Sequence, residues 1–145
     1  MSNRMNHIAD YFRVKVQSAT PMGLIFMVYE RAMKSIEEAQ EALDTRNRDL
    51  FCKKIVHAQD CLRELRTSLN LEIGEIAQSL YRLYDFMIDQ LIEANLSREN
   101  PGPYLKRVSR MLSDLYRTWK QAEKKLQSQK ASSTRVTEEA FSISG

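Results

Sequence analysis

Glycine and proline, the residues that most often interrupt regular structure, are scarce in this sequence. Four glycines and three prolines occur among 145 residues, so we expect a small number of long elements. No alternating apolar and polar run is bounded by the turn residues that a hairpin needs, which disfavours a sheet. The sequence therefore predicts an all-α protein.

Long hydrophobic runs are also absent. The longest uninterrupted apolar run covers residues 24–29, whereas about 20 apolar residues are needed to cross a bilayer. The first residues, MSNRMNHIADYF, lack an apolar signal core followed by a small-residue cleavage site. We therefore expect a cytosolic protein with no direct membrane insertion.

The two cysteines, Cys52 and Cys61, are nine positions apart. On one helix this spacing places them about 13 Å apart along the axis and on opposite faces, too far for a disulfide bond. Reduced and partly buried thiols are typical of a cytosolic protein.

The residues that carry catalytic or metal chemistry are few and poorly spaced. Lys54 and Arg4 stand three residues before His57 and His7, where a carboxylate-bridged metal bundle needs glutamate. No zinc-binding spacing occurs, and the glycines are too isolated for a phosphate-binding loop. We expect no cofactor, no metal site and no enzymatic activity.

Apolar residues recur at alternating spacings of three and four in four segments, the period of an amphipathic helix. The first series is Ile25, Tyr29, Ala32, Ile36, Ala39 and Leu43. The second is Phe51, Ile55, Ala58, Leu62, Leu65 and Leu69. The third is Ile73, Ala77, Leu80, Tyr84, Met87, Leu91 and Ala94, and the fourth is Leu105, Val108, Leu112, Leu115, Trp119, Ala122 and Leu126. Four stripes of similar length predict an antiparallel four-helix bundle.

Capping signals and composition set the expected boundaries. Thr20 and Pro21 suit the N-cap and first position of the first helix, and Asn47 or Asp49 is the predicted cap of the second. The bundle is predicted to occupy residues 19–127. Residues 1–18 form a predicted N-terminal arm, and residues 128–145, rich in serine and threonine without an apolar period, a predicted disordered tail.

The first and third helices carry more apolar residues than one core stripe requires. The extra residues are Met22, Phe26, Met27 and Met33 in the first, and Ile76, Tyr81, Leu83, Phe86, Ile88 and Ile92 in the third. Methionine and aromatic side chains suit a surface that binds apolar helices. Two alternatives remain open: a broad core face with scattered exposed apolar residues, and a self-association surface.

Positive charge is concentrated in the fourth helix. Residues 101–130 contain eight basic and two acidic residues. A basic helical face attracts phosphate, so a nucleic-acid-binding module is a competing interpretation. No nucleic-acid-reading motif accompanies it, and a solvated face is more common.

Four sequence segments, taken in order, resemble the signature segments of the FliS family of flagellar secretion chaperones. They are SATPMGLIFMVYERAM, AQDCLRELRTSLN, IAQSLYRLYDFMIDQLIEAN and DLYRTWKQA, with Tyr11 ahead of them. The resemblance covers Tyr11 to Ala122. Arg31 departs from it, because the family usually has glycine there, and the connection NPGPY is also unusual.

The resemblance implies a cytosolic chaperone that binds the C-terminal helical region of flagellin, prevents its premature polymerisation and delivers it to the flagellar type III export apparatus. Flagellin and the cytoplasmic part of the export gate are the expected partners, and no nucleic acid is expected. The alternatives are a self-associating structural bundle, with a homodimer when free, and a basic nucleic-acid-binding module.

The resemblance and the apolar surplus together give the candidate site residues. The candidate client-binding groove is Leu24, Met27, Tyr29, Leu69, Asn70, Leu80, Leu83, Tyr84 and Met87. Ile8 and Tyr11 of the arm are the candidate cap over that groove. Arg117, Lys120 and Lys124 form the candidate basic docking face.

Overall fold

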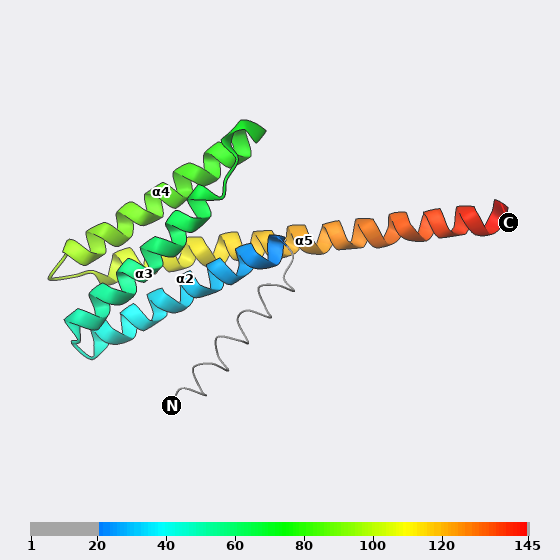
Figure 1. Ribbon diagram of the computed structural model, residues 1–145. Coiled ribbons are helices and arrows are strands. Elements are labelled where there is room, and N and C mark those ends of the chain that lie inside the picture. Colours follow the sequence, from blue (N-terminus) through cyan, green and yellow to red (C-terminus); the bar gives the residue numbers. More distant parts are fainter. Residues whose placement is uncertain (1–20, 145) are drawn as a thin grey trace, which may run out of the picture. The chain divides into compact units, whose positions relative to one another are not determined.

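The computed structural model describes the backbone of residues 21–144 and the side chains of residues 21–132. These residues form four α-helices and one 3-10 helix, with no strand among them (Figure 1). The elements are α2 (Pro21–Asp44), α3 (Arg48–Thr67), η1 (Leu71–Ile73), α4 (Glu75–Leu96) and α5 (Gly102–Ser144). The all-α helical bundle is confirmed. The predicted arm, with Ile8 and Tyr11, and the predicted cap Thr20 lie outside the described residues.

A tight turn joins α2 to α3. The amide of Asn47 donates to the carbonyl of Ala42 (2.8 Å), and Arg46 takes a left-handed φ of 57°. The side chain of Asn47 then accepts a hydrogen bond from the amide of Leu50 (3.1 Å) and caps α3. Of the two predicted caps, Asn47 is therefore the one used.

The connection from α3 to α4 differs from the prediction, which placed Ile73 on the core stripe of the third helix. Ile73 ends η1 and is 80% exposed. The following residue, Gly74, has a φ of 136°, which breaks the helical path, so α4 begins only at Glu75. The apolar period alone did not predict this break.

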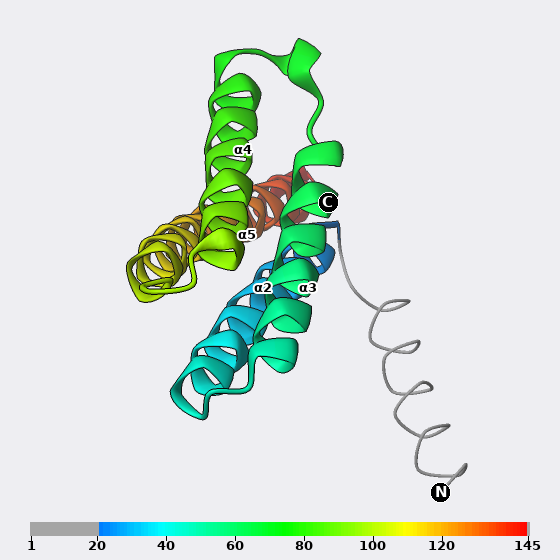
Figure 2. The ribbon, with the colours of Figure 1, turned by 90° about the vertical axis from the view of Figure 1, so that its left-hand side faces the viewer.

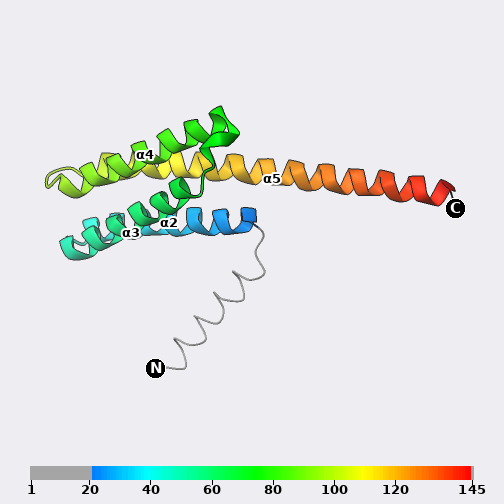
Figure 3. The ribbon, with the colours of Figure 1, turned by 45° about the horizontal axis from the view of Figure 1, so that its top comes forward.

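Neighbouring helices run antiparallel. α2 lies beside α3, and α3 lies beside α4 (Figures 1 and 2). Arg48, at the start of α3, donates to the carbonyl of Asn95 near the end of α4, whereas Arg66 near the end of α3 pairs with Asp85. The first turns of α5 lie beside the end of α4, where Arg107 donates to Gln90 (Figure 3).

The core largely follows the predicted stripes, although Ile25 and Leu43 of the first stripe are only half-buried. The largest fully buried side chains are Tyr29, Tyr84, Phe51, Ile55, Leu62, Met87, Leu91, Leu105, Leu112 and Val108. Phe26 and Ile88, assigned above to the apolar surplus, are buried as well. Phe26 lies three residues before Tyr29 and Ile88 lies four after Tyr84, so each shares the core face of its helix.

The chain divides into two units between Leu112 and Ser113, inside α5. The later part of the predicted fourth stripe is less buried than the first part, and Leu126 is exposed. The helix continues to Ser144, which corrects the disordered tail predicted for 128–145. No proline or glycine interrupts the helix from Tyr104 to Ser144. None of the helices described here combines the length and the apolar character that spanning a bilayer requires.

Replacing Gly74 with alanine is expected to destabilise the protein by about 1–3 kcal/mol. A Cβ at this position would meet no atom within 4 Å, so the whole cost comes from the φ of 136°. Urea unfolding of the wild type and the Gly74→Ala variant measures the difference.

The matched control is Gly102→Ala. Gly102 has no positive φ, and the nearest atom to its added Cβ is Asn100 Oδ1 at 4.0 Å. This variant is expected to keep wild-type stability or gain slightly. Equal stability of the two variants would contradict the strain assigned to Gly74.

Candidate functional site

Helix α4 exposes more large apolar side chains than any other described element. They are Ile76, Tyr81, Leu83, Phe86, Ile92 and Leu96. Its buried face is Ala77, Leu80, Tyr84, Met87, Ile88, Leu91 and Ala94. Successive residues are about 100° apart around a helix, so the exposed set falls on two sides of the buried face. We name them the Leu83 edge (Ile76, Leu83, Phe86) and the Tyr81 edge (Tyr81, Ile92, Leu96).

Polar side chains of α3 partly cover the Tyr81 edge. Arg66 Nη1 lies 2.7 Å from Asp85 Oδ1, and the guanidinium carbon of Arg66 lies 5.5 Å from the centroid of the Tyr81 ring. On the same side of α4 as the Leu83 edge, Gln90 accepts a hydrogen bond from Arg107 in the first turns of α5. The side chains of the Leu83 edge stay exposed within the first unit: Ile76 is 78% exposed, Leu83 37% and Phe86 43%.

The candidate groove residues do not form one surface. Leu24 and Leu83 are exposed, and Met27 and Leu69 are half-buried. The remaining apolar candidates, Tyr29, Leu80, Tyr84 and Met87, belong to the core. Asn70 is exposed, and its side chain accepts a hydrogen bond from the amide of Glu72 (3.1 Å) as the cap of η1.

A pair of buried tyrosines connects α2 to α4. The hydroxyl oxygens of Tyr29 and Tyr84 are 2.6 Å apart, and the two rings meet edge to face with centroids 6.3 Å apart. Both side chains are buried, so this contact holds α4 in place from inside the core. These tyrosines position the exposed edges and do not form part of the surface.

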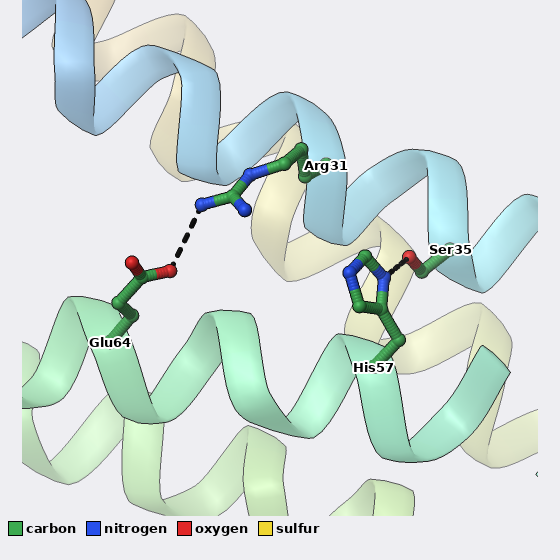
Figure 4. A network of polar contacts seen from close by, with 4 residues as sticks. All are labelled: Arg31, Ser35, His57 and Glu64. Atoms are coloured by element: carbon green, nitrogen blue, oxygen red, sulfur yellow. Dashed lines mark hydrogen bonds and ion pairs between the residues drawn. The ribbon is translucent and has the colours of Figure 1, made fainter. Parts of the chain in front are cut away.

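The exposed face shared by α2 and α3 is bridged by polar contacts. Arg31 Nη2 lies 3.0 Å from Glu64 Oε2, and Ser35 Oγ lies 2.5 Å from His57 Nδ1 (Figure 4). Arg31 of α2 thus extends across to α3. Because Ser35 is buried between the helices, its hydrogen bond to His57 joins them and offers no nucleophile to a substrate.

A second ion pair on this side joins Lys54 Nζ to Glu38 Oε2 (2.5 Å). The hydrogen bond from Lys54 is the main reason that the pKa of Glu38 lies below its ordinary value. Burial raises the pKa of the Cys61 thiol, which favours the unreactive protonated form. The part of the chain that the structure describes contains no group of side chains that could hold a metal ion.

The three residues of the candidate basic face lie on the second unit of the chain. Arg117, Lys120 and Lys124 are exposed, and spacings of three and four residues place them on one side of α5. The Lys120 ammonium lies 5.4 Å from the centroid of the Tyr116 ring. The arrangement presents a row of positive charge along one helix.

The candidate list did not include Ile76 or Phe86, although both occur in the predicted apolar surplus. The sequence feature that could have identified them as surface residues is their position outside the core stripe of α4. Spacing separates these residues from the stripe, but it does not say which extra residues the neighbouring helices cover.

Comparison with known proteins gives consistent matches. The family described as flagellar protein FliS matches residues 4–126. The chain is 31% identical over 117 residues to the flagellar secretion chaperone FliS of Bacillus subtilis, covering 81% of this chain and 86% of the relative. It is 34% identical over 116 residues to the flagellar secretion chaperone FliS of Salmonella typhimurium, covering 76% and 82%. It is 28% identical over 116 residues to the protein of the same name from Vibrio cholerae, covering 77% and 84%.

Removing the Tyr84 hydroxyl is expected to destabilise the protein by about 1 kcal/mol, the usual net value of a hydrogen bond. The Tyr84→Phe variant keeps the ring and loses the 2.6 Å contact with Tyr29. Denaturant unfolding measures the effect. Tyr81→Phe, a change at an exposed tyrosine of the same helix, is the control and should stay within about 0.5 kcal/mol of wild type. Equal loss of stability in Tyr84→Phe and Tyr81→Phe would contradict the role of the Tyr29–Tyr84 contact in positioning α4.

Proposed function

The chain belongs to the FliS family of flagellar proteins, and from this premise we propose that it binds the C-terminal helical region of flagellin and keeps it unpolymerised until export. Membership gives the broader role directly: it is a flagellar export chaperone and not an enzyme. The observation that supports the finer proposal is the concentration of exposed apolar side chains along α4.

The Leu83 edge is the proposed seat for a client helix. Leu83 and Phe86 are 37% and 43% exposed and stand three residues apart on α4. An amphipathic helix laid along this edge would bury its own apolar stripe against them, the usual way in which a helix occupies a groove. Burial of the stripe removes the apolar surface that would otherwise drive polymerisation.

The core residues of the candidate groove contribute indirectly under this proposal. Tyr29, Tyr84 and Met87 are buried and hold α4 in position, whereas Leu24 and Leu83 are accessible without any opening of the core. Client and chaperone must also separate at export. We therefore expect a dissociation constant of micromolar to nanomolar order, with binding in the cytosol.

The basic face of α5 is the proposed docking surface for the cytoplasmic part of the export gate. Arg117, Lys120 and Lys124 present charge of one sign on an exposed helix side. Such a surface speeds the encounter with an acidic partner and favours one orientation of docking. Client binding and gate binding would then use different parts of the chain.

The double variant Leu83→Ala/Phe86→Ala is expected to bind a flagellin C-terminal peptide about tenfold or more weakly than wild type, since two contact side chains are truncated. Calorimetric titration of the full chain measures this. The control is Leu50→Ala, because Leu50 is also 37% exposed but lies at the start of α3. Unchanged affinity in the double variant would place the client elsewhere.

Reversing two charges of the basic face, in Lys120→Glu/Lys124→Glu, is expected to weaken binding to the purified cytoplasmic domain of the export gate by about tenfold while leaving flagellin affinity unchanged. Parallel titrations with the two partners measure both. The control Lys53→Glu/Arg98→Glu changes the net charge equally at exposed positions in the first unit. Gate affinity that is unchanged, or that falls equally in both variants, would remove the proposed docking face.

A further inference from the structure

The connection between α3 and α4 holds the most exposed large apolar side chains of the described residues. Ile73 is 80% exposed, Ile76 is 78% exposed, and Leu71 is 43% exposed. We name Leu71, Glu72, Ile73, Glu75 and Ile76 the connection surface. Single exposed apolar residues are ordinary on proteins, but three such residues within six positions are a concentration that calls for a partner.

Local hydrogen bonds hold this patch in a defined conformation. The side chain of Asn70 accepts from the amide of Glu72 (3.1 Å), and its carbonyl accepts from the amide of Ile73 (3.2 Å). Gly74 follows with a φ of 136°, and its carbonyl accepts from the amide of Gln78 (3.3 Å). The turn is thus built to keep Ile73 outward, and little conformational entropy would be lost when a partner binds there.

The charge of the connection surface is entirely negative. Glu72 and Glu75 flank Ile73, and no lysine or arginine occurs from Thr67 to Tyr81. Neither glutamate forms an ion pair with a residue that the structure describes. Glu75 also stands in the first turn of α4, where an acid stabilises the helix dipole, so a test has to separate binding from stability.

The connection surface continues into the Leu83 edge. Ile76 belongs to both, and Phe86 lies ten residues further along α4, a rise of about 15 Å. A client helix seated on the Leu83 edge would therefore reach the connection surface at one end. At that end, the polar residues of the client helix would lie beside Glu72 and Glu75, which have no basic residue near them in the sequence.

We propose that the connection surface binds one end of the client helix, by an apolar side chain against Ile73 and Ile76 and a lysine or arginine beside Glu72 and Glu75. This inference rests on the proposed function and adds a charge requirement that fixes the direction of the bound helix. The opposite direction would leave the basic residue away from the acidic end, so one orientation is preferred.

The test is calorimetric titration of the full chain with the flagellin C-terminal peptide and with a version whose lysines and arginines are replaced by glutamine. Ile73→Ser is expected to weaken binding of the natural peptide about fivefold or more. Because Ile73 is 80% exposed, this change removes little packing. Leu96→Ser, at a position 70% exposed at the other end of α4, is the control and should change affinity by less than about twofold.

The charge requirement is tested with Glu72→Gln/Glu75→Gln against the control Glu37→Gln/Glu41→Gln, two exposed acids of α2. The first pair should lower affinity for the natural peptide by about threefold at low salt and leave affinity for the uncharged peptide unchanged. The difference should vanish as salt rises from about 0.05 M to about 0.5 M. Urea unfolding of each variant confirms that the fold is retained.

The outcomes separate this inference from the proposed function. If the wild-type protein does not bind the natural peptide, both the proposed function and this inference are overturned. If wild type binds but Ile73→Ser and the glutamine pair bind as well as their controls, the connection surface has no role and only this inference is overturned. Loss confined to the connection variants, with the stated charge and salt dependence, supports it.

Discussion

The contact between Tyr29 and Tyr84 is the interaction on which the exposed surface depends. α4 packs on α3, and the tyrosine pair joins it to α2 across the core. The 2.6 Å hydroxyl contact and the edge-to-face rings, together with the packing against α3, fix the rotation of α4 about its own axis. That rotation decides which apolar residues of α4 point inward and which remain on the Leu83 and Tyr81 edges.

A helix with apolar residues on both sides of its core face cannot bury all of them in a small bundle. Leu80, Tyr84 and Met87 take the interior, and the flanking residues stay in contact with water. On the side that α2 and α3 share, ion pairs connect the two helices. Arg31 pairs with Glu64, and Lys54 pairs with Glu38. The first unit therefore has one side that ion pairs bridge and one helix, α4, with exposed apolar side chains on both sides of its core face.

Much of this arrangement could be predicted from the sequence, because apolar spacing indicates which face of each helix packs inward. The core of α3 and the cap at Asn47 followed from the sequence, as did the surplus on α4. The break in the helix at Gly74 was not predicted, because the sequence does not reveal the φ of a single glycine and such a glycine can also lie inside a helix. The helical course of residues 128–144 was also not predicted, because a segment rich in serine and threonine and without an apolar period carries no helix signal.

The candidate site was less predictable than the fold for a physical reason. Tyr29 and Leu24 lie on the same helix and both match the family pattern, yet one is buried and the other exposed. Only the packing of neighbouring helices separates a residue that positions a surface from one that forms it. Spacing along one helix carries no information about that packing.

The two cysteines of α3 allow separation of α2 from α3 to be detected by thiol labelling. Cys61 is buried beneath the α2–α3 side and its pKa is raised, so a thiol reagent reaches it only when those helices separate. Cys52, half-buried on the same helix, supplies a reference for reagent reactivity in the closed state. The labelling rate of Cys61 relative to that of Cys52 therefore measures how often α2 and α3 separate. The comparison needs no introduced probe and applies to the free chaperone and to the chaperone with a client bound.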